Sequence, residues 1–161
     1  DEYGAVVGEI EKLCLYARRR SQITEQDVTE LVGLSREEKI FACMDAAGAG
    51  DARRALSAWR DVLATDRSAA FRAVGGVAFV LRKWLRAQQM ADEGLSPRAI
   101  APKVMMWGRE NQLAEILRRQ PARRVKRLLS RLAELDSQAK AGARSIETGI
   151  ETLLLETAAP E

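Results

Sequence analysis

The sequence contains no histidine, so the commonest general base and metal ligand of proteins is absent from all 161 residues. Its two cysteines, Cys14 and Cys43, form no CxxC pair, which excludes a cysteine-based zinc site and a disulfide framework. We expect both thiols to be buried among apolar neighbours, as in a protein of the reducing cytoplasm. No GxxxxGK[ST] phosphate loop is present. We therefore expect no catalytic residue, no metal ion and no cofactor in this chain.

Proline is scarce, with four residues, and runs of valine, threonine and tyrosine that favour strands are nearly absent. The dominant residues are alanine, leucine, arginine and glutamate, which favour helices. The longest apolar run, 73–81, is much shorter than the roughly 20 residues that span a bilayer. No signal-peptide pattern precedes it, and the start at Asp1 suggests a piece of a longer protein. The sequence predicts an all-α protein without a membrane partner.

Amphipathic periodicity and capping signals divide the chain into successive helices. The predicted helices cover approximately 3–20, 24–33, 35–47, 51–63, 68–93, 96–106, 109–119, 121–141 and 145–156. In the first of them, Val6, Ile10, Leu13, Cys14 and Ala17 share one apolar stripe. A boundary near 33–35 separates a two-helix piece, 1–33, from a helical bundle, 34–161. The tail from Thr157 to Glu161 is expected to fray.

The predicted helix 68–93 changes character along its length. Its first half is apolar almost all round, which predicts a place in the middle of the bundle. The pair Gly75-Gly76 lies inside it, and we expect a neighbouring helix to approach closely there, since glycine weakens an exposed helix by about 1 kcal/mol. The second half carries Arg82, Lys83 and Arg86 and is expected to emerge toward solvent or a partner subunit.

The net charge of +3 is unevenly distributed. Seven basic residues and no acidic one occur in a basic run that consists of Arg118, Arg119, Arg123, Arg124, Lys126, Arg127 and Arg131. One interpretation is a solvated face whose aliphatic stems cover the edge of the core. The other is contact with nucleic-acid phosphates or with an acidic partner. The sequence leaves both open.

The three tryptophans require separate interpretations. Trp59 lies on an apolar stripe and is predicted to be in the core, whereas Trp84, beside the basic half of the long helix, fits either the core or an interface. Trp107 lies at a helix break next to Gly108. Its simplest role is to plug the end of the bundle, and its alternative role is to stack on a nucleic-acid base.

Motifs along nearly the whole chain occur in an order that resembles one known family. In the first part these are GEIEKL at 8–13, ITEQDV at 23–28, EKIF at 38–41, Asp45-Ala46, Gly50-Asp51 and Ala55-Leu56. Later ones are Leu81-Arg82-Lys83, GLSPRAIA at 94–101, Leu135-Asp136, Lys140-Ala-Gly142, Ile150-Glu151 and LLL at 153–155. Together they resemble the C-terminal region of the delta subunit of the bacterial DNA polymerase III clamp loader.

The resemblance implies that residues 1–33 end an AAA+ lid-like domain and that 34–161 form a helical collar domain. In that family the collars of five subunits pack into a ring, in which gamma/tau-type and delta-prime-type subunits are the partners. The sliding clamp is opened by an N-terminal domain that is not in this sequence, and primer-template DNA lies nearby. The implied function is therefore a scaffold for oligomerisation in the bacterial replisome, in the cytoplasm. The parent assembly belongs to a DNA polymerase holoenzyme, but this piece is not expected to be an enzyme.

Two alternative functions stay open at this point. One is an independent basic nucleic-acid-binding module, and the other is the C-terminal region of an ATP-hydrolysing AAA+ loader subunit. In the ATP-hydrolysing subunits an arginine follows a glycine at the start of the lid helix, whereas here Gly4 is followed by Ala5, which favours delta. The resemblance and the charge pattern give Trp107 and the basic run as expected contacts for DNA or a partner. Arg82, Lys83, Trp84 and Arg86 are expected at a subunit interface.

Overall fold

The computed structural model describes residues 2–17, 22–24, 36–65 and 69–160, and every regular element among them is a helix. The predicted all-α class is therefore confirmed. The chain divides into two compact units, 1–35 and 36–161. Within the described ranges, no helix has the length and apolar character that crossing a membrane requires.

The first unit contains α1, which runs from Glu2 to Tyr16. Of the predicted apolar stripe, only Leu13 and Ala17 are buried. Val6, Ile10 and Cys14 are exposed, so the expected burial of Cys14 is wrong. A helical stripe is buried only where a second element packs on it, and α1 is the only helix described in this unit. Residues 25–33 of the predicted helix 24–33, and the predicted start of the next helix at Ser35, lie outside the described residues.

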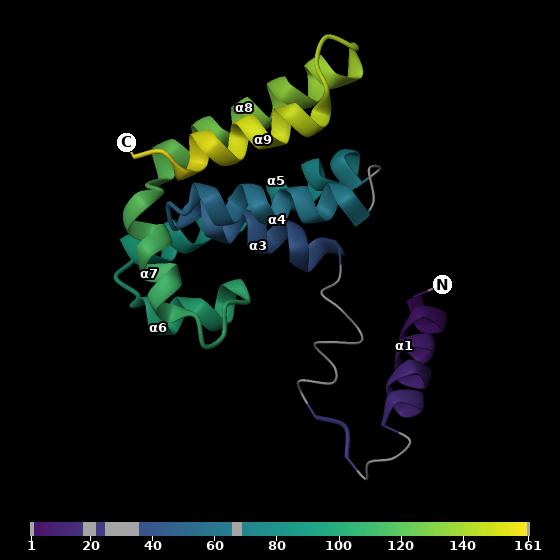
Figure 1. The fold of residues 1–161 in the computed structure, drawn as a ribbon. Coiled ribbons are helices and arrows are strands. Elements are labelled where there is room, and N and C mark those ends of the chain that lie inside the picture. Colours follow the sequence, from purple (N-terminus) through teal and green to yellow (C-terminus); the bar gives the residue numbers. More distant parts are fainter. Residues whose placement is uncertain (1, 18–21, 25–35, 66–68, 161) are drawn as a thin grey trace. The chain divides into compact units, whose positions relative to one another are not determined.

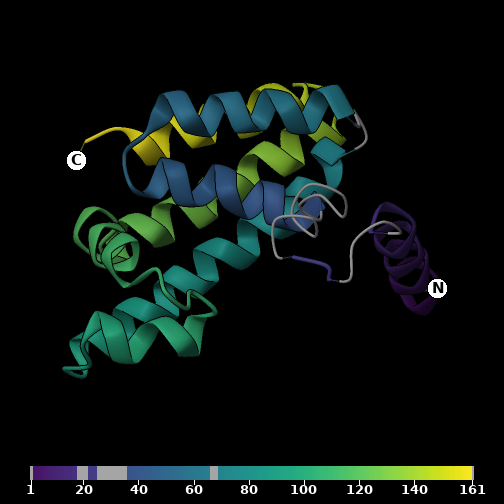
Figure 2. The same ribbon diagram turned by 60° about the horizontal axis from the view of Figure 1, so that its bottom comes forward.

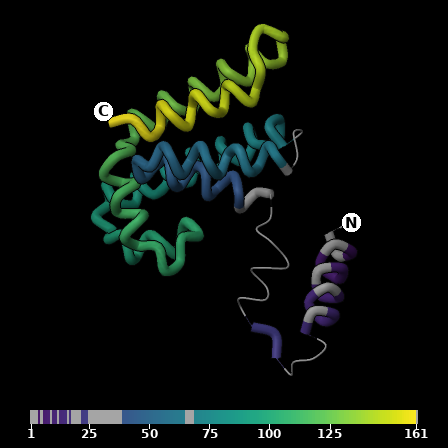
Figure 3. The backbone as a smooth tube through the Cα atoms, in the orientation of Figure 1, coloured from purple at the N-terminus to yellow at the C-terminus, as the bar shows by residue number. Residues whose placement is uncertain are grey.

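The second unit is a helical bundle with one end elaborated by short helices (Figure 1). Its helices are α3 (Arg36–Gly48), α4 (Ala52–Thr65), α5 (Ala69–Asp92), α6 (Pro97–Ile100), the 3-10 helix η1 (Ala101–Val104), α7 (Glu110–Arg119), α8 (Ala122–Lys140) and α9 (Ile146–Ala158). The short connection at 49–51 makes α3 and α4 antiparallel neighbours, and α8 and α9 form a second antiparallel pair that packs on them and on α5 (Figures 1 and 3). Figure 2 shows α5 continuing to the end of the bundle where α6 and α7 lie.

Local capping explains where several of these helices begin. The Asp51 carboxylate accepts a hydrogen bond from the Arg54 backbone N–H at 2.9 Å. Ser96 and Ser145 accept from the N–H groups three residues later, at 3.4 and 3.3 Å. Each cap satisfies a donor that the first helical turn leaves unpaired. These three predicted helix starts are confirmed.

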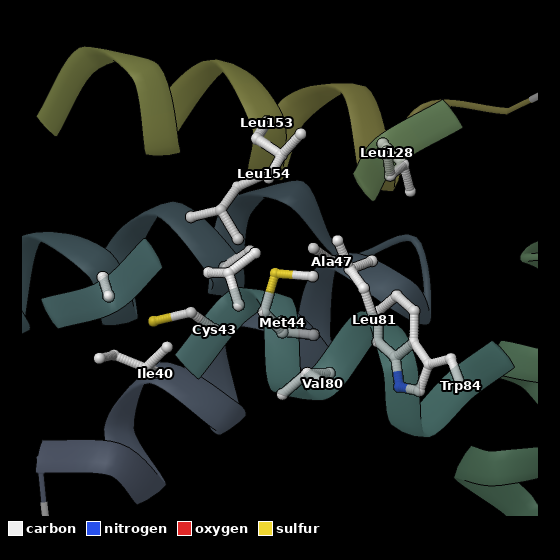
Figure 4. Close-up of a cluster of buried hydrophobic side chains, with 14 of the residues drawn as sticks. Ile40, Cys43, Met44, Ala47, Val80, Leu81, Trp84, Leu128, Leu153 and Leu154 are labelled. Carbon is white, nitrogen blue, oxygen red and sulfur yellow. The ribbon is translucent and has the colours of Figure 1, made fainter. Parts of the chain in front are cut away.

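The core of the second unit lies between α3, α5 and the α8–α9 pair (Figure 4). Cys43 and Met44 from α3 meet Leu81 from α5 and Leu154 from α9, and all four are buried. Burial raises the pKa of the Cys43 thiol to about 12. The predicted core positions of Cys43 and Trp59 are confirmed.

Two predictions about helix surroundings are wrong in part. The first half of α5 is not surrounded on all sides, because Phe71 and Phe79 are 63% and 42% exposed. The tail does not fray at Thr157, since α9 continues to Ala158 and Thr157 is fully buried. The Thr157 hydroxyl donates to the Leu153 carbonyl at 2.7 Å. The Thr157 carbonyl is covered as well, since it accepts hydrogen bonds from Gln120 and Arg124.

Candidate interaction surfaces

The C-terminal ends of α3, α7 and α9 converge on two buried glutamines. The side-chain amide of Gln88, on α5, donates to the carbonyls of Leu117 and Gln120, both at 2.7 Å. The amide of Gln120 donates in turn to the carbonyls of Gly48 at 3.2 Å and Thr157 at 2.9 Å. Carbonyls in the last turn of a helix have no partner within the helix, so these side chains supply what the helix ends lack. Neither glutamine belongs to a motif or periodic pattern in the sequence.

Two arginines of the basic run complete this arrangement. The Arg124 guanidinium is 6% exposed and donates to the carbonyls of Glu156, Thr157 and Ala159 at 2.8, 3.3 and 2.6 Å. Arg119 donates to the Ala158 carbonyl at 3.0 Å. A cation at a helix C-terminus is favourable because the helix dipole is negative there. The groups of Arg119 and Arg124 that were expected to contact DNA or a partner are therefore used to hold the end of α9.

Two further members of the run form ion pairs with nearby carboxylates. Arg118 pairs with Glu115 at 2.6 Å, and this hydrogen bond lowers the pKa of Glu115 and raises that of Arg118. Arg131 pairs with Glu134 at 3.1 Å and with Glu156 at 3.4 Å. Such exposed pairs add little stability, because water and salt screen them. The charge pattern of the run could not reveal these partners. Glu115 and Glu134 lie just outside the run in the sequence, and Glu156 is on another helix.

The other three basic residues, Arg123, Lys126 and Arg127, are exposed on α8. They line an open hollow of about 1000 Å³ together with Arg131, Glu134 and Glu156. The hollow borders the end of the chain at Ala159 and Pro160. We call Arg123, Lys126 and Arg127 the α8 trio, because all three are exposed on this helix and line one concavity.

A second surface runs along α5. Phe71, Gly75, Phe79, Arg82 and Arg86 recur at intervals of three or four residues, so they lie on one side of the helix, and all five are exposed. We call this side the α5 face. It is apolar in its first half and basic in its second half. The predicted interface residues Arg82 and Arg86 lie on it, whereas Trp84 is 1% exposed and packs inside the bundle (Figure 4).

Beside the α5 face lies an apolar groove of about 670 Å³. It is lined by Ile40, Phe41, Ala69, Arg72, Gly75, Gly76, Phe79 and Met105. The rings of Phe41 and Phe79, both in its lining, stack on each other, with centroids 5.5 Å apart and planes inclined by 23°. Met105, which is 54% exposed, follows η1 in a left-handed backbone conformation (φ 54°, ψ 48°). A residue other than glycine is uncommon in this conformation, which here brings a large apolar side chain to the groove.

A group of charged side chains lies next to the groove. The Lys83 ammonium stands 5.7 Å from the centroid of the Phe41 ring. Burial lowers the pKa of Lys83; the nearby Asp45 opposes this change and Arg109 adds to it. Asp45 is buried and accepts a hydrogen bond from Arg109 at 2.6 Å. This ion pair connects α3 to the residue that precedes α7, and its partners are 64 residues apart in the sequence, so periodicity could not reveal it.

Trp107 does not plug the bundle, because its side chain is 65% exposed. The adjacent Met106 is fully buried and takes the interior position. Gly108 follows with a positive φ of 69°, which turns the chain toward α7. The exposed ring remains accessible to a partner, as its alternative role requires.

Comparison with known proteins identifies the family of the chain. Residues 37–157 match the family described as DNA polymerase III delta subunit, C-terminal domain. Among solved structures, the DNA clamp loader delta protein of Bacillus subtilis matches with a TM-score of 0.72 and 23% identity, over 94% of this chain and 44% of that chain. At this identity the likeness shows the fold, and the chain spans less than half of that protein's length. No curated protein matches the sequence.

The family match covers most of the chain, including every described helix from α4 to α8 and most of α3 and α9. The order of the sequence motifs had indicated the C-terminal region of a delta subunit, and that prediction is confirmed. The chain belongs to the family of C-terminal domains of DNA polymerase III delta subunits.

Proposed function

We propose that the chain is the scaffold region of a delta-type subunit and holds neighbouring subunits in the pentamer that loads the sliding clamp onto primed DNA. Residues 1–33 would then end a lid-like AAA+ domain, and 34–161 would form the collar. The neighbours are subunits of the gamma/tau and delta-prime types. Clamp contact belongs to a domain outside this sequence, and the assembly works in the bacterial cytoplasm.

The observation that carries this proposal is the apolar half of the α5 face. The core of the unit is closed around Trp84 and Leu81, yet Phe71 and Phe79 remain exposed on the same helix, with Met105 beside them. Contiguous exposed apolar side chains mark interaction surfaces, and aromatic residues, methionine and arginine are enriched at their centres. The neighbouring Arg82 and Arg86 provide a polar border of the kind that interfaces have.

We expect the chain to co-elute with gamma/tau-type and delta-prime-type subunits in size-exclusion chromatography after co-expression. Phe71→Glu should weaken this association by at least tenfold, because a carboxylate would have to be desolvated at the interface. Titration by isothermal calorimetry measures the change. Since Phe71 is exposed, the variant should keep the helical circular dichroism spectrum of the parent.

The matched control is Ala133→Glu, which adds the same charge at an exposed position of α8. It should assemble like the parent chain. A parent chain that does not associate with any loader subunit would contradict the scaffold proposal. Equal association of both variants over the whole concentration range would show that the apolar half of the α5 face is not the contact surface.

The α8 trio supports a second candidate function, nucleic-acid binding. Three exposed cations around one concavity match a phosphate backbone, whose contacts release counterions and make affinity depend on salt. Arg123→Ala with Lys126→Ala should reduce the slope of log K against log salt concentration by roughly 1.5 on primed DNA, as expected for two lost phosphate contacts. Fluorescence anisotropy at several salt concentrations measures this slope.

The control for this test removes two positive charges elsewhere. Arg98 on α6 and Lys103 on η1 are exposed, and their double alanine variant has the same net charge as the first double variant. It should retain the parent slope. Equal slopes for the two double variants would show that total charge, and not the α8 trio, determines binding.

A further inference from the structure

We propose that the groove between α3 and α5 receives an amphipathic helix of a neighbouring protein subunit, one that carries an aliphatic or aromatic anchor and a carboxylate close to it. The proposal rests on the scaffold function and goes beyond it, since it names the contact surface and the chemistry of the segment that fits. The floor, the walls and the charge of the groove each favour such a segment.

The floor of the groove is formed by two glycines within a helix. A Cβ atom at Gly76 would lie 3.1 Å from Cγ2 of Ile40, so packing inside the bundle accounts for that glycine. A Cβ atom at Gly75 would meet nothing within 4 Å. Glycine inside a helix is less stable than alanine by about 1 kcal/mol, and no contact within the described chain requires it at position 75. Close approach of a partner to the α5 backbone would require it.

The walls favour a helix as the partner element. They consist of α3 and α5, whose backbone groups are bonded within each helix, together with Met105. An extended segment needs a strand edge for its own N–H and C=O groups, and the described residues contain no strand. A helix has its backbone bonds satisfied and can insert side chains at i, i+3 or i+4. Phe41, Phe79 and Met105 offer the apolar surface that such anchors need.

The charge around the groove favours an acidic partner. From Ala69 to Ala91, α5 carries four basic residues and no acidic one: Arg72, Arg82, Lys83 and Arg86. Among the described residues, the carboxylate that acts on the pKa of Lys83 is that of Asp45, which is buried and already bonded to Arg109. Burial disfavours the charged form of the half-buried Lys83 ammonium. A carboxylate from outside would stabilise its charged form, whereas a basic segment would be repelled.

Gly75→Leu tests the proposal without removing any contact inside the chain. Leucine would fill the groove and favours the helix over glycine, so the variant should be at least as stable to heat as the parent. We expect its affinity for the co-expressed loader subunits to fall at least tenfold, measured by calorimetric titration. Ala133→Leu, at an exposed position of α8, is the matched control and should bind like the parent.

The outcomes distinguish this proposal from the scaffold proposal. If the parent chain binds no loader subunit, the scaffold function itself is wrong. If the parent binds and Gly75→Leu binds equally well, the scaffold function stands and the groove is not its contact surface. Lys83→Glu should weaken binding as well, and unchanged binding of this variant would refute the acidic partner.

Photo-cross-linking identifies the occupant directly. Benzoylphenylalanine introduced at Phe79 should form an adduct with a gamma/tau-type or delta-prime-type subunit. Mass spectrometry should place the adduct in a segment that has an acidic residue within one helical turn of an apolar one. An adduct with a second copy of this chain, with nucleic acid, or with a segment lacking acidic residues would overturn the proposal, as would the absence of any adduct in the assembled complex.

Discussion

Replacing Arg124 with methionine is expected to lower the free energy of unfolding of the second unit by about 3 kcal/mol. Arg124 is 6% exposed and donates to three carbonyls at the end of α9. Its removal leaves the carbonyls of Glu156 and Ala159 without this donor, whereas Thr157 keeps its bond from Gln120. The midpoint of thermal unfolding should fall by roughly 10 °C for a unit of this size. Circular dichroism during heating and urea denaturation measure both quantities.

The neighbouring residue provides the control. Arg123 is exposed, and the same substitution there removes the same charge from the same helix without removing a bond to α9. Arg123→Met should therefore unfold at the parent midpoint. If Arg123→Met and Arg124→Met unfold at the same temperature, the end of α9 does not depend on Arg124, and the division of the basic run into structural and exposed members is wrong.

This pair shows what the sequence could and could not predict about the basic run. The charge pattern located the run correctly on α7 and α8, but it gave the same interpretation to Arg123 and Arg124. What separates them is the position of the α9 end, about 32 residues later in the chain, where carbonyls need donors. Gln88 and Gln120 belong to the same arrangement and carry no pattern of their own. Burial of polar side chains against distant helix ends is a property of the fold and has no local signal.

The helices themselves were predictable because their determinants are local. Ser96 and Ser145 bind N–H groups three residues away, and the sequence alone places them there. The side of α5 that its neighbouring helices bury could not be predicted in this way. Since the first half of α5 is apolar on all sides, periodicity could not separate the exposed Phe79 from the buried Val80, and only the packing of α3 and α8 does so. The candidate groove was missed for this reason.

The exposure of Trp84 and Trp107 could not be predicted from local sequence either. The sequence leaves Trp84 between the core and an interface, and the structure places it in the core. For Trp107 the simpler role, plugging the end of the bundle, is wrong because the ring is exposed. The α3 end explains the position of Trp84. A Cβ atom at Gly48 would lie 2.5 Å from Cη2 and 2.7 Å from Cζ2 of the indole. The ring occupies the space that a side chain at position 48 would need.

Gly48→Ala is accordingly expected to destabilise the second unit by about 2 kcal/mol, the usual cost of overpacking a core. The higher helix propensity of alanine would otherwise make this change favourable, by up to about 1 kcal/mol. Because the clash is with buried atoms of Trp84 and with Ile116 at 3.3 Å, relief by a flexible side chain is not available. Urea denaturation of the variant and of the parent measures the change, provided that the free energy of unfolding depends equally steeply on urea concentration in both.

Combining Gly48→Ala with Trp84→Phe separates the clash from every other effect of the alanine. Phenylalanine lacks the two outer ring atoms that approach position 48, and it also lacks the indole N–H, which is buried without a partner among the described residues. In the Trp84→Phe background, Gly48→Ala should therefore be close to neutral, which corresponds to a coupling of about 2 kcal/mol between the two positions. Additive effects would instead mean that alanine disturbs the Gly48 carbonyl and its bond to Gln120. A coupling of the expected size would confirm that the indole of Trp84 packs inside the bundle against the end of α3. The side chains of α5 that remain for contact with a partner would then be Phe71, Phe79, Arg82 and Arg86.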